Sequence, residues 1–238
     1  MKVRLEQKEF DALKKFESLH HPDIWNWIMD KVGRRENLNI LDVSEECAVF
    51  AVMLAEQYPT NKVTCLIRGE KPKVPLPSNV SFLRSDFKNC NWSQIEELST
   101  YDVIIVNELT HEIPEIGQFF KALKKHLNPG APIVVLSRPK NPPLPVPECC
   151  LLLWRKLMPT KEEITAAAAY AQLGYTTFSA AVPISVDRFQ WESMLYSGCF
   201  PAVRATIKCG EPEIRQYCNK LSPKVNFEEK MSIYVFRE

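Results

Sequence analysis

The sequence predicts an α/β fold, a parallel sheet with helices on both faces. Short, continuously apolar segments of buried-strand type recur along the chain, and segments with apolar residues at helical spacing separate them. Strands and helices that alternate at this spacing form βαβ units, whose strands run parallel. With 238 residues and 45% hydrophobic content, the chain suits a single domain with a sizeable core.

The first part of the chain supplies most of the predicted sheet. Two helices are expected before the first strand, one within residues 3–19 and one in "PDIWNWIMDKVGRR" after His21. Strands are then predicted at residues 38–43, 62–67, 80–86, 101–109 and 131–137. Helices are predicted after the first strand, after a capping box formed by Ser93 and Glu96, and in "EIGQFFKALKKHLNPG", which stops at Gly130.

The second part begins with a loop rich in proline. "RPKNPPLPVP", Arg138 to Pro147, holds five prolines in ten residues and should be stiff and extended. It leaves the carboxyl end of a strand, where α/β sheets bind ligands, so it is either a wall or lid of a site or a rigid connection. Next we expect a helix with a Thr160–Glu163 capping box that stops at Gly174, a strand at 175–184, helices at 187–195 and 211–221, and a final strand at 231–236.

Composition excludes several classes of function. Lys plus Arg number 30 against 29 for Asp plus Glu, so the net charge of +1 predicts neither nucleic-acid binding nor a basic membrane patch. The N-terminal segment lacks the apolar core of a signal peptide, and no run of about 18 apolar residues occurs, so we expect a soluble, cytoplasmic protein. Its 8 cysteines form no C-x-x-C pair and predict no metal site, although the adjacent Cys149 and Cys150 can be oxidised or bind a soft metal.

Three longer motifs resemble one known family. "ALKKHLNPGAPIVVLS" is similar to a helix, Pro-Gly turn and fifth strand, "YDVIIVNELTHEI" to a fourth strand with its loop, and "PTKEEITAAAAYAQLGYTTF" to a helix that ends before a sixth strand. Together they resemble the class I S-adenosylmethionine-dependent methyltransferases, in particular the small-molecule branch with ubiquinone-biosynthesis and arsenite methyltransferase-like enzymes. The resemblance implies a Rossmann-like, seven-stranded, mostly parallel sheet whose last strand, "MSIYVF", is antiparallel and lies beside the fifth.

The resemblance also implies which residues face the cofactor, S-adenosylmethionine. Asp42 stands where the family has an acidic residue near the methionine moiety, and Asn107 and Glu108 follow the fourth strand, where a residue faces the cofactor. Asp86 and Phe87 match the acidic and apolar pair that brackets adenine.

Two departures from the family weaken this site. The glycine-rich turn aligns to "SEECA", so Ser44 stands at the first glycine position, and the carboxylates of Glu45 and Glu46 would occupy the space where backbone amides approach the ligand. At the end of "KVTCLIRG", where the family binds the ribose diol with an acidic residue, Ile67 and Arg68 offer no hydrogen-bond acceptor. The sequence therefore predicts a degenerate cofactor site.

Methyl transfer also needs a place for the acceptor and sometimes a base. His111, after the fourth strand, and Glu108 are the candidate catalytic residues, with a helix-capping histidine and a solvated carboxylate as the alternatives. Trp25 and Trp191 are candidates for lining an apolar substrate pocket, although aromatic residues at helical spacing are more often core.

Two functions follow from these observations. The first is a pseudoenzyme, in which the fold binds another small molecule or a protein partner; the second is an active small-molecule methyltransferase. A nicotinamide-dependent oxidoreductase is disfavoured, because its phosphate-binding turn requires glycines even more strictly. We expect one methyltransferase-like domain over residues 1–238, with an N-terminal lid at 1–35, a cofactor half at 36–137 and a substrate half at 138–238.

Overall fold

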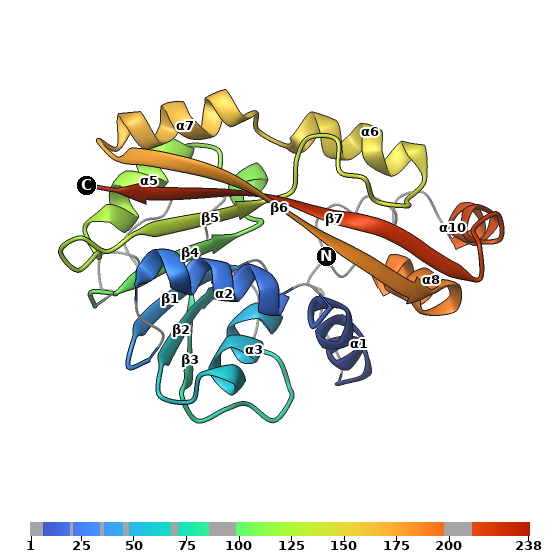
Figure 1. Cartoon of the computed structure of the whole chain (residues 1–238), viewed down its shortest axis with the longest axis horizontal. Coiled ribbons are helices and arrows are strands. Elements are labelled where there is room, and N and C mark those ends of the chain that lie inside the picture. The colour runs from blue at the N-terminus through green and yellow to red at the C-terminus, as the bar shows by residue number, and fades with distance from the viewer. Residues whose placement is uncertain are drawn as a thin grey trace.

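The computed structural model describes residues 7–19, 21–33, 36–44, 48–67, 71–85, 99–197 and 211–238. The strands within these ranges form one seven-stranded sheet in the order β3-β2-β1-β4-β5-β7-β6 (Figure 1). They are β1 (Asn39–Ser44), β2 (Lys62–Ile67), β3 (Val80–Arg84), β4 (Val103–Asn107), β5 (Ile133–Ser137), β6 (Gly174–Asp187) and β7 (Lys224–Arg237).

Eight described α-helices and one described 3₁₀-helix connect these strands. They are α1 (Gln7–Glu17), α2 (His21–Val32), α3 (Val49–Gln57), η2 (Thr110–Glu112), α5 (Ile116–Lys124), α6 (Glu148–Leu157), α7 (Lys161–Tyr170), α8 (Arg188–Ser197) and α10 (Glu211–Cys218). None of the described helices is long and apolar enough to cross a bilayer.

The sheet has the predicted mixture of strand directions. Strands β1 to β5 pair in parallel, and β7 lies antiparallel between β5 and β6. The prediction of a mostly parallel, seven-stranded sheet with its last strand antiparallel beside the fifth is confirmed.

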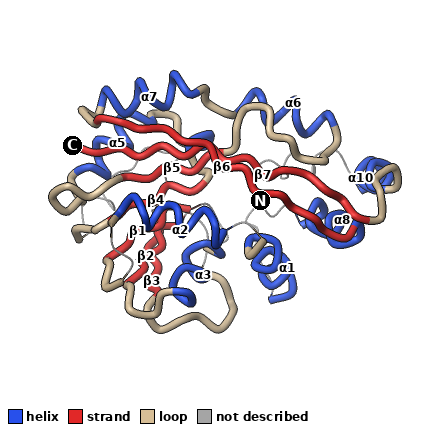
Figure 2. Tube along the Cα trace, in the orientation of Figure 1, coloured by secondary structure: helices blue, strands red, loops and turns tan. Residues whose placement is uncertain are grey.

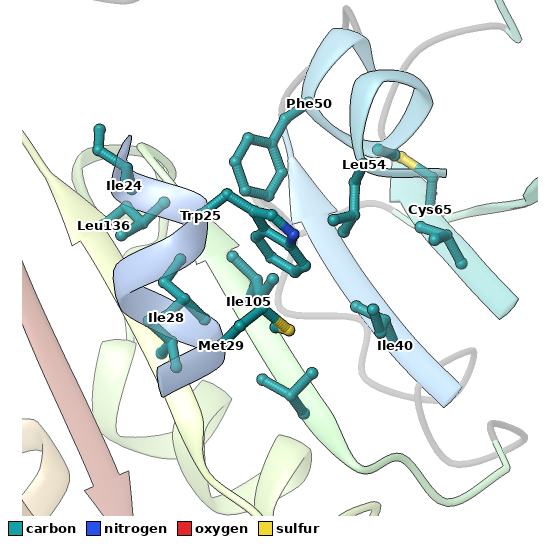
Figure 3. Packing of buried hydrophobic residues seen from close by; sticks show 14 of the residues in the cluster. Ile24, Trp25, Ile28, Met29, Ile40, Phe50, Leu54, Cys65, Ile105 and Leu136 are labelled. Carbon is teal, nitrogen blue, oxygen red and sulfur yellow. The ribbon is translucent and has the colours of Figure 1, made fainter. Parts of the chain in front are cut away.

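Helices cover both faces of the strands (Figure 2). Because side chains alternate along a strand, Leu41 and Val43 pack with α5 and α7 on one face, and Ile40 packs with α2 and α3 on the other. On the α2 side, the indole of Trp25 lies beside Phe50 at a ring-centroid distance of 5.9 Å (Figure 3).

Strands β6 and β7 continue well past the end of β5. Pairing with β5 ends at Ser232, so residues 180–187 and 224–231 form a two-stranded extension, here called the arm, beyond the carboxyl end of β5 (Figure 1). The arm buries Val182, Ile184 and Val186 in a cluster, here called the arm cluster, with apolar residues of α1, the start of α3, the proline-rich loop, α6, α8 and α10. This cluster lies next to the edge of the sheet where α/β proteins bind ligands.

Some predicted elements differ from those observed. The capping box of Thr160 and Glu163 is present, but α7 ends at Tyr170, the left-handed residue after it is Gln172, and Gly174 already belongs to β6. Helix α6 was not predicted, and β6 and β7 are longer than expected. The predicted capping box of Ser93 and Glu96 lies outside the described residues.

Candidate functional site

The candidate site lies at the carboxyl ends of the parallel strands, where β1, β4 and β5 end side by side. Ser44 at the end of β1 is in register with Asn107 at the end of β4, which is in register with Leu136 of β5. Asn107 is half-buried. Two buried polar groups occupy this edge, one around Asp42 and one around Arg138.

The first group is centred on Asp42, whose side chain is fully buried on the face covered by α2 and α3. Its Oδ2 accepts hydrogen bonds from the hydroxyl of Ser44 and from the Cys65 thiol, at 3.4 Å from Sγ. Its Oδ1 has no hydrogen-bond partner among the described residues. Burial, only partly offset by these hydrogen bonds, raises the pKa of Asp42 to about 6. Asp42 is therefore a buried carboxyl group with one oxygen left to bind a donor.

The turn after β1 leads into α3, which begins at Val49. Glu45, Glu46 and Cys47 lie outside the described residues, and so do Asp86, Phe87 and Arg68. Ala48 follows the turn with a left-handed φ of 51°, and α3 begins at Val49 with no side-chain cap. Ala48, the N-cap residue, thus supplies no side-chain acceptor for the first amide groups of α3.

The end of β2 is apolar. Ile67 is 2% exposed and packs in the cluster that Cys65 shares with α2 and α3. Its backbone carbonyl accepts a hydrogen bond from the amide of Ser85 at 2.9 Å, which ties the end of β2 to the end of β3. A buried isoleucine side chain cannot accept hydrogen bonds from a ribose diol. The end of β2 therefore supplies no side-chain hydrogen-bond acceptor at Ile67.

The second group is an ion cluster of Glu108, Arg138 and Glu229. The Arg138 guanidinium donates to Glu108 Oε2 through Nη1, and to both oxygens of Glu229 through Nε at 2.9 Å and Nη2 at 3.2 Å. Glu108, Arg138 and Glu229 are 8%, 2% and 1% exposed, so the cluster is shielded from solvent.

Charges within the cluster offset the cost of burial. Burial disfavours the guanidinium charge, but Glu108 and Glu229 outweigh that effect and raise the pKa of Arg138. Burial also raises the pKa of Glu108, which Arg138 opposes and which Glu229 and Glu17 reinforce. Glu17 belongs to α1, so the N-terminal helix contributes charge to the site.

Glu108 occupies an unusual backbone position. Its φ is 49°, in the left-handed region that non-glycine residues rarely adopt, and its amide donates to the Leu136 carbonyl at 2.9 Å. Arg138 holds Oε2, whereas Oε1 is buried and has no hydrogen-bond partner among the described residues. Such strained residues cluster at binding and catalytic sites. Glu108 therefore presents one fixed carboxylate oxygen at the edge of the sheet.

His111 follows Glu108 in the same loop. Its side chain is 5% exposed, Nε2 lies 3.9 Å from Glu112 Oε1, and its ring packs against Trp154 at a centroid distance of 5.5 Å. The neighbouring Thr110 hydroxyl is buried and has no hydrogen-bond partner within the described ranges. The loop from Glu108 to His111 thus carries both predicted catalytic residues in a largely buried setting.

The two tryptophans predicted to line a pocket lie in separate hydrophobic clusters. Trp25 is 2% exposed beneath α3 and contacts Phe50 and Tyr58. Trp191 is 0% exposed in the arm cluster and packs against Phe16 of α1 and Phe227 of β7.

The proline-rich loop is bound to the body of the protein by two indole groups. Trp154 Nε1 donates to the Pro139 carbonyl at 3.0 Å, and Trp191 Nε1 donates to the Pro145 carbonyl at 2.8 Å. Leu144 and Val146 of the loop are buried in the arm cluster. These contacts hold the loop against the body of the protein.

The structure brings together some predicted residues and adds others. Asp42 contacts Ser44, and Ser44 neighbours Asn107. Glu108, however, contacts Arg138, which in turn binds Glu229, and the sequence did not single out Arg138 or Glu229. A usable signal for Arg138 was its place directly after the predicted strand "APIVVLS", whose residues are nearly all apolar. Glu229 gave no such signal, because it lies in the part of β7 that precedes the predicted strand.

The adjacent cysteines lie at the start of α6. Their Sγ atoms are 3.8 Å apart, and of the two only Cys149 is exposed. Among the described residues, no three His, Cys, Asp or Glu side chains are grouped so that they can hold a metal ion.

Comparison with known proteins identifies the fold. No family model and no curated protein matches the sequence. Among solved structures, a SAM-dependent methyltransferase from Aquifex aeolicus is 14% identical with a TM-score of 0.58. The alignment covers 98% of this chain and 100% of that chain. The plantazolicin methyltransferase BpumL, in complex with a monoazolic desmethylPZN analogue and SAH, is 11% identical with a TM-score of 0.54, covering 98% and 86%. The YcgJ protein from Bacillus subtilis is 12% identical with a TM-score of 0.55, covering 92% and 99%. The chain has the fold of class I S-adenosylmethionine-dependent methyltransferases, as its motifs predicted.

Proposed function

We propose that this protein uses the methyltransferase fold to bind a small molecule or a protein partner, and that it binds S-adenosylmethionine weakly or not at all. One observation carries the proposal: Ile67 is buried among apolar side chains at the end of β2, where the resemblance implies a ribose-binding carboxylate. The next residue in the sequence, Arg68, has only hydrogen-bond donors in its side chain.

The size of the expected loss supports this proposal. Each missing hydrogen-bonding contact to the cofactor costs about 1 to 3 kcal/mol. The missing ribose acceptor and the glycine-free turn "SEECA" together correspond to a loss of about 10²-fold or more in affinity. The free thiols of Cys65, Cys149 and Cys218 are compatible with a protein that acts in the cytoplasm.

A second candidate function is an active small-molecule methyltransferase. It is favoured by the buried oxygens Asp42 Oδ1, Glu108 Oε1 and Thr110 Oγ1, all at the ligand-binding edge, which have no partner among the described residues. Buried polar atoms are normally hydrogen-bonded, so these atoms favour a ligand that donates hydrogen bonds. In this function, Asp42, Ser44 and Asn107, with Asp86 and Phe87, would hold the donor molecule. Glu108 or His111 would accept a proton from the methyl acceptor.

Isothermal titration calorimetry separates the two functions. We expect no heat above background when the full-length protein is titrated with S-adenosylmethionine or S-adenosylhomocysteine up to concentrations on the order of 100 μM. A micromolar dissociation constant for either compound would contradict the first proposal. In that case, loss of binding in Asp42→Asn, with a melting temperature no lower than that of the wild type, would support the active enzyme.

A repaired variant tests whether the named losses explain weak binding. The triple substitution Glu45→Gly, Glu46→Gly and Ile67→Asp restores the two motifs, whereas Glu45→Gly, Glu46→Gly and Ile67→Asn supplies a weaker, uncharged acceptor. We expect the Asp variant to gain at least about tenfold over the Asn variant, since hydrogen bonds to charged groups are worth about 1.5 to 3 kcal/mol. Equal affinities in two folded variants would mean that a charged acceptor at position 67 does not control cofactor binding.

A further inference from the structure

The two outer strands of the sheet differ in length and charge. Strand β3 has five residues and ends at Arg84, and Lys71 Nζ lies 5.5 Å from the ring of Phe82. Strand β6 has 14 residues, and no charged residue occurs from Gly174 to Val186. Proteins usually keep edge strands short, or place charged residues on them, to prevent pairing with other chains. The β3 edge has this protection, whereas most of the β6 edge lacks it.

Two observations show which backbone groups of β6 face outward. In an antiparallel strand, the N–H and C=O of one residue point to the same neighbour, and the direction alternates along the strand. The amide of Arg188, directly after β6, donates to the Pro223 carbonyl at 3.0 Å, so even-numbered residues face β7. Pro183 has no N–H yet lies within an unbroken ladder, so odd-numbered residues face away from β7.

The outward groups form a short, accessible row. Tyr175, Thr177, Ser179 and Ala181 each direct one N–H and one C=O away from β7, and Pro183 ends the row of donors. Tyr175 is 51% exposed, and Ser179 and Ala181 are also exposed. No strand pairs with this edge within the described residues.

We propose that two copies of this protein associate through β6, with the two strands antiparallel about a two-fold axis at Phe178. In this register Tyr175 lies opposite Ala181 of the second copy, and Thr177 lies opposite Ser179. All four outward residues of each copy are then paired, and Pro183 falls beyond the last pair. Four residue pairs that each exchange two hydrogen bonds give about eight hydrogen bonds between the copies.

The side chains of β6 suit a second copy of the same strand. Since the segment carries no charge, pairing it with itself places no like charges opposite each other. Phe178 packs edge-on against Trp27 of α2 at a centroid distance of 4.6 Å, and Lys31 Nζ lies 4.8 Å from its ring. Two Phe178 rings would face each other across the axis and extend this aromatic row, and such cross-strand pairs stabilise sheets. The bulky Tyr175 lies opposite the small Ala181, which avoids a clash.

Sedimentation velocity of the full-length protein tests the interface. We expect the wild type to form a dimer at micromolar concentration and Ser179→Pro to raise the dimer dissociation constant by at least about 100-fold, because the substitution removes outward donors and blocks the added strand. The Ser179 amide does not bond to β7, so the ladder within the chain is kept. Ser179→Ala keeps the amide and is expected to dimerise like the wild type. A monomeric wild type up to 100 μM, or a dimeric Ser179→Pro variant, would overturn the proposal.

Two further variants test fold and register. If Ser179→Pro melts well below Ser179→Ala, the exposed substitution Ala181→Lys replaces it and is expected to give monomers, because a long, charged side chain opposite Tyr175 creates the clash that Ala181 avoids. Under mild oxidation, Phe178→Cys should form a covalent dimer because residue 178 lies opposite itself. Ser185→Cys, exposed on the same strand, should cross-link no more than the wild type. Equal cross-linking of both cysteine variants would refute this register. A monomer whose β6 edge binds an extended peptide of another protein would show that the partner of β6 is not a second copy.

Discussion

Buried carboxyl groups lie at the end of β1 and at the ends of β4 and β5, and the two places compensate the cost of burial in different ways. At the end of β1, Asp42 has only the hydroxyl of Ser44 and the thiol of Cys65 as partners, and burial raises its pKa to about 6. At the ends of β4 and β5, Arg138 binds the carboxylates of Glu108 and Glu229. The first end can relieve its buried charge by taking up a proton, and the second relieves it with a guanidinium. The two ends should therefore respond differently to substitution and to pH.

The largest effect is expected when the guanidinium is removed. Arg138→Met leaves two carboxylates buried without their cation, and breaking a buried ion pair in this way costs about 3 to 5 kcal/mol. Urea unfolding at pH 7 measures the loss of unfolding free energy. Arg138→Lys keeps the charge but loses the two-point contact with Glu229, so it should lose less.

A double variant sharpens this prediction. Combining Arg138→Met with Glu229→Met removes one of the uncompensated carboxylates, so part of the lost stability should return. If Arg138→Met alone costs less than about 1 kcal/mol, the ion cluster does not hold the arm to the sheet.

Because of Asp42, the stability of the protein should fall as the pH rises, the opposite of what a carboxylate in an ordinary ion pair causes. Its pKa is about 6 in the folded protein and 3.8 ordinarily, so the folded state holds the proton more tightly. Its contribution to stability is thus fully present below about pH 4 and is lost as the pH rises through 6, by about 3 kcal/mol. We expect Asp42→Asn to gain stability relative to the wild type between pH 4.5 and pH 8 in urea unfolding.

An exposed aspartate provides the control for this experiment. Asp23→Asn, in the first turn of α2, should follow the wild type across the same pH range. If Asp42→Asn also runs parallel to the wild type, Asp42 keeps its ordinary acidity and its environment is more polar than its burial indicates.

The same comparison shows what the sequence could and could not predict. Asp42, which lies within β1, was singled out by the family resemblance, whereas the parallel sheet followed from several buried, apolar strands. The ion cluster was not, because Arg138 and Glu229 are 91 residues apart and meet only when β7 inserts beside β5. No local pattern encodes that pairing.

Local patterns failed at two helices for physical reasons. Helix α6 contains the apolar run "CCLLLW", which has no helical period, and it leaves Leu152 49% exposed. Helix α7 was expected to stop at a glycine, but Gln172 adopts the left-handed conformation with a φ of 56°. Glycine is favoured at such positions, but glutamine is tolerated here at some cost.

The smallest effect on stability is expected at Ser44. Substitutions there distinguish a hydrogen bond to Asp42 from simple packing beside it. The Ser44 hydroxyl donates a hydrogen bond to Asp42 and thereby lowers the pKa of that carboxyl group. Ser44→Ala removes the hydroxyl, so the pKa of Asp42 should rise further. We expect a loss of about 1 kcal/mol at pH 8, and a smaller loss at pH 5, where the carboxyl group is largely protonated and needs the hydroxyl less. Ser44→Thr keeps the hydroxyl and should retain most of the stability at both pH values.

The pH dependence of this loss decides between the two roles of Ser44. An equal loss at both pH values would show that Ser44 only fills space beside Asp42.

Combining Ser44→Ala with Arg138→Met tests whether the Asp42 group and the ion cluster stabilise the protein independently. Because no described side chain bridges Asp42 and Arg138, we expect their effects on unfolding free energy to add within about 0.5 kcal/mol. A larger coupling would mean that the two buried carboxyl groups share one electrostatic site, and a ligand that bound at one end would then change the protonation of the other.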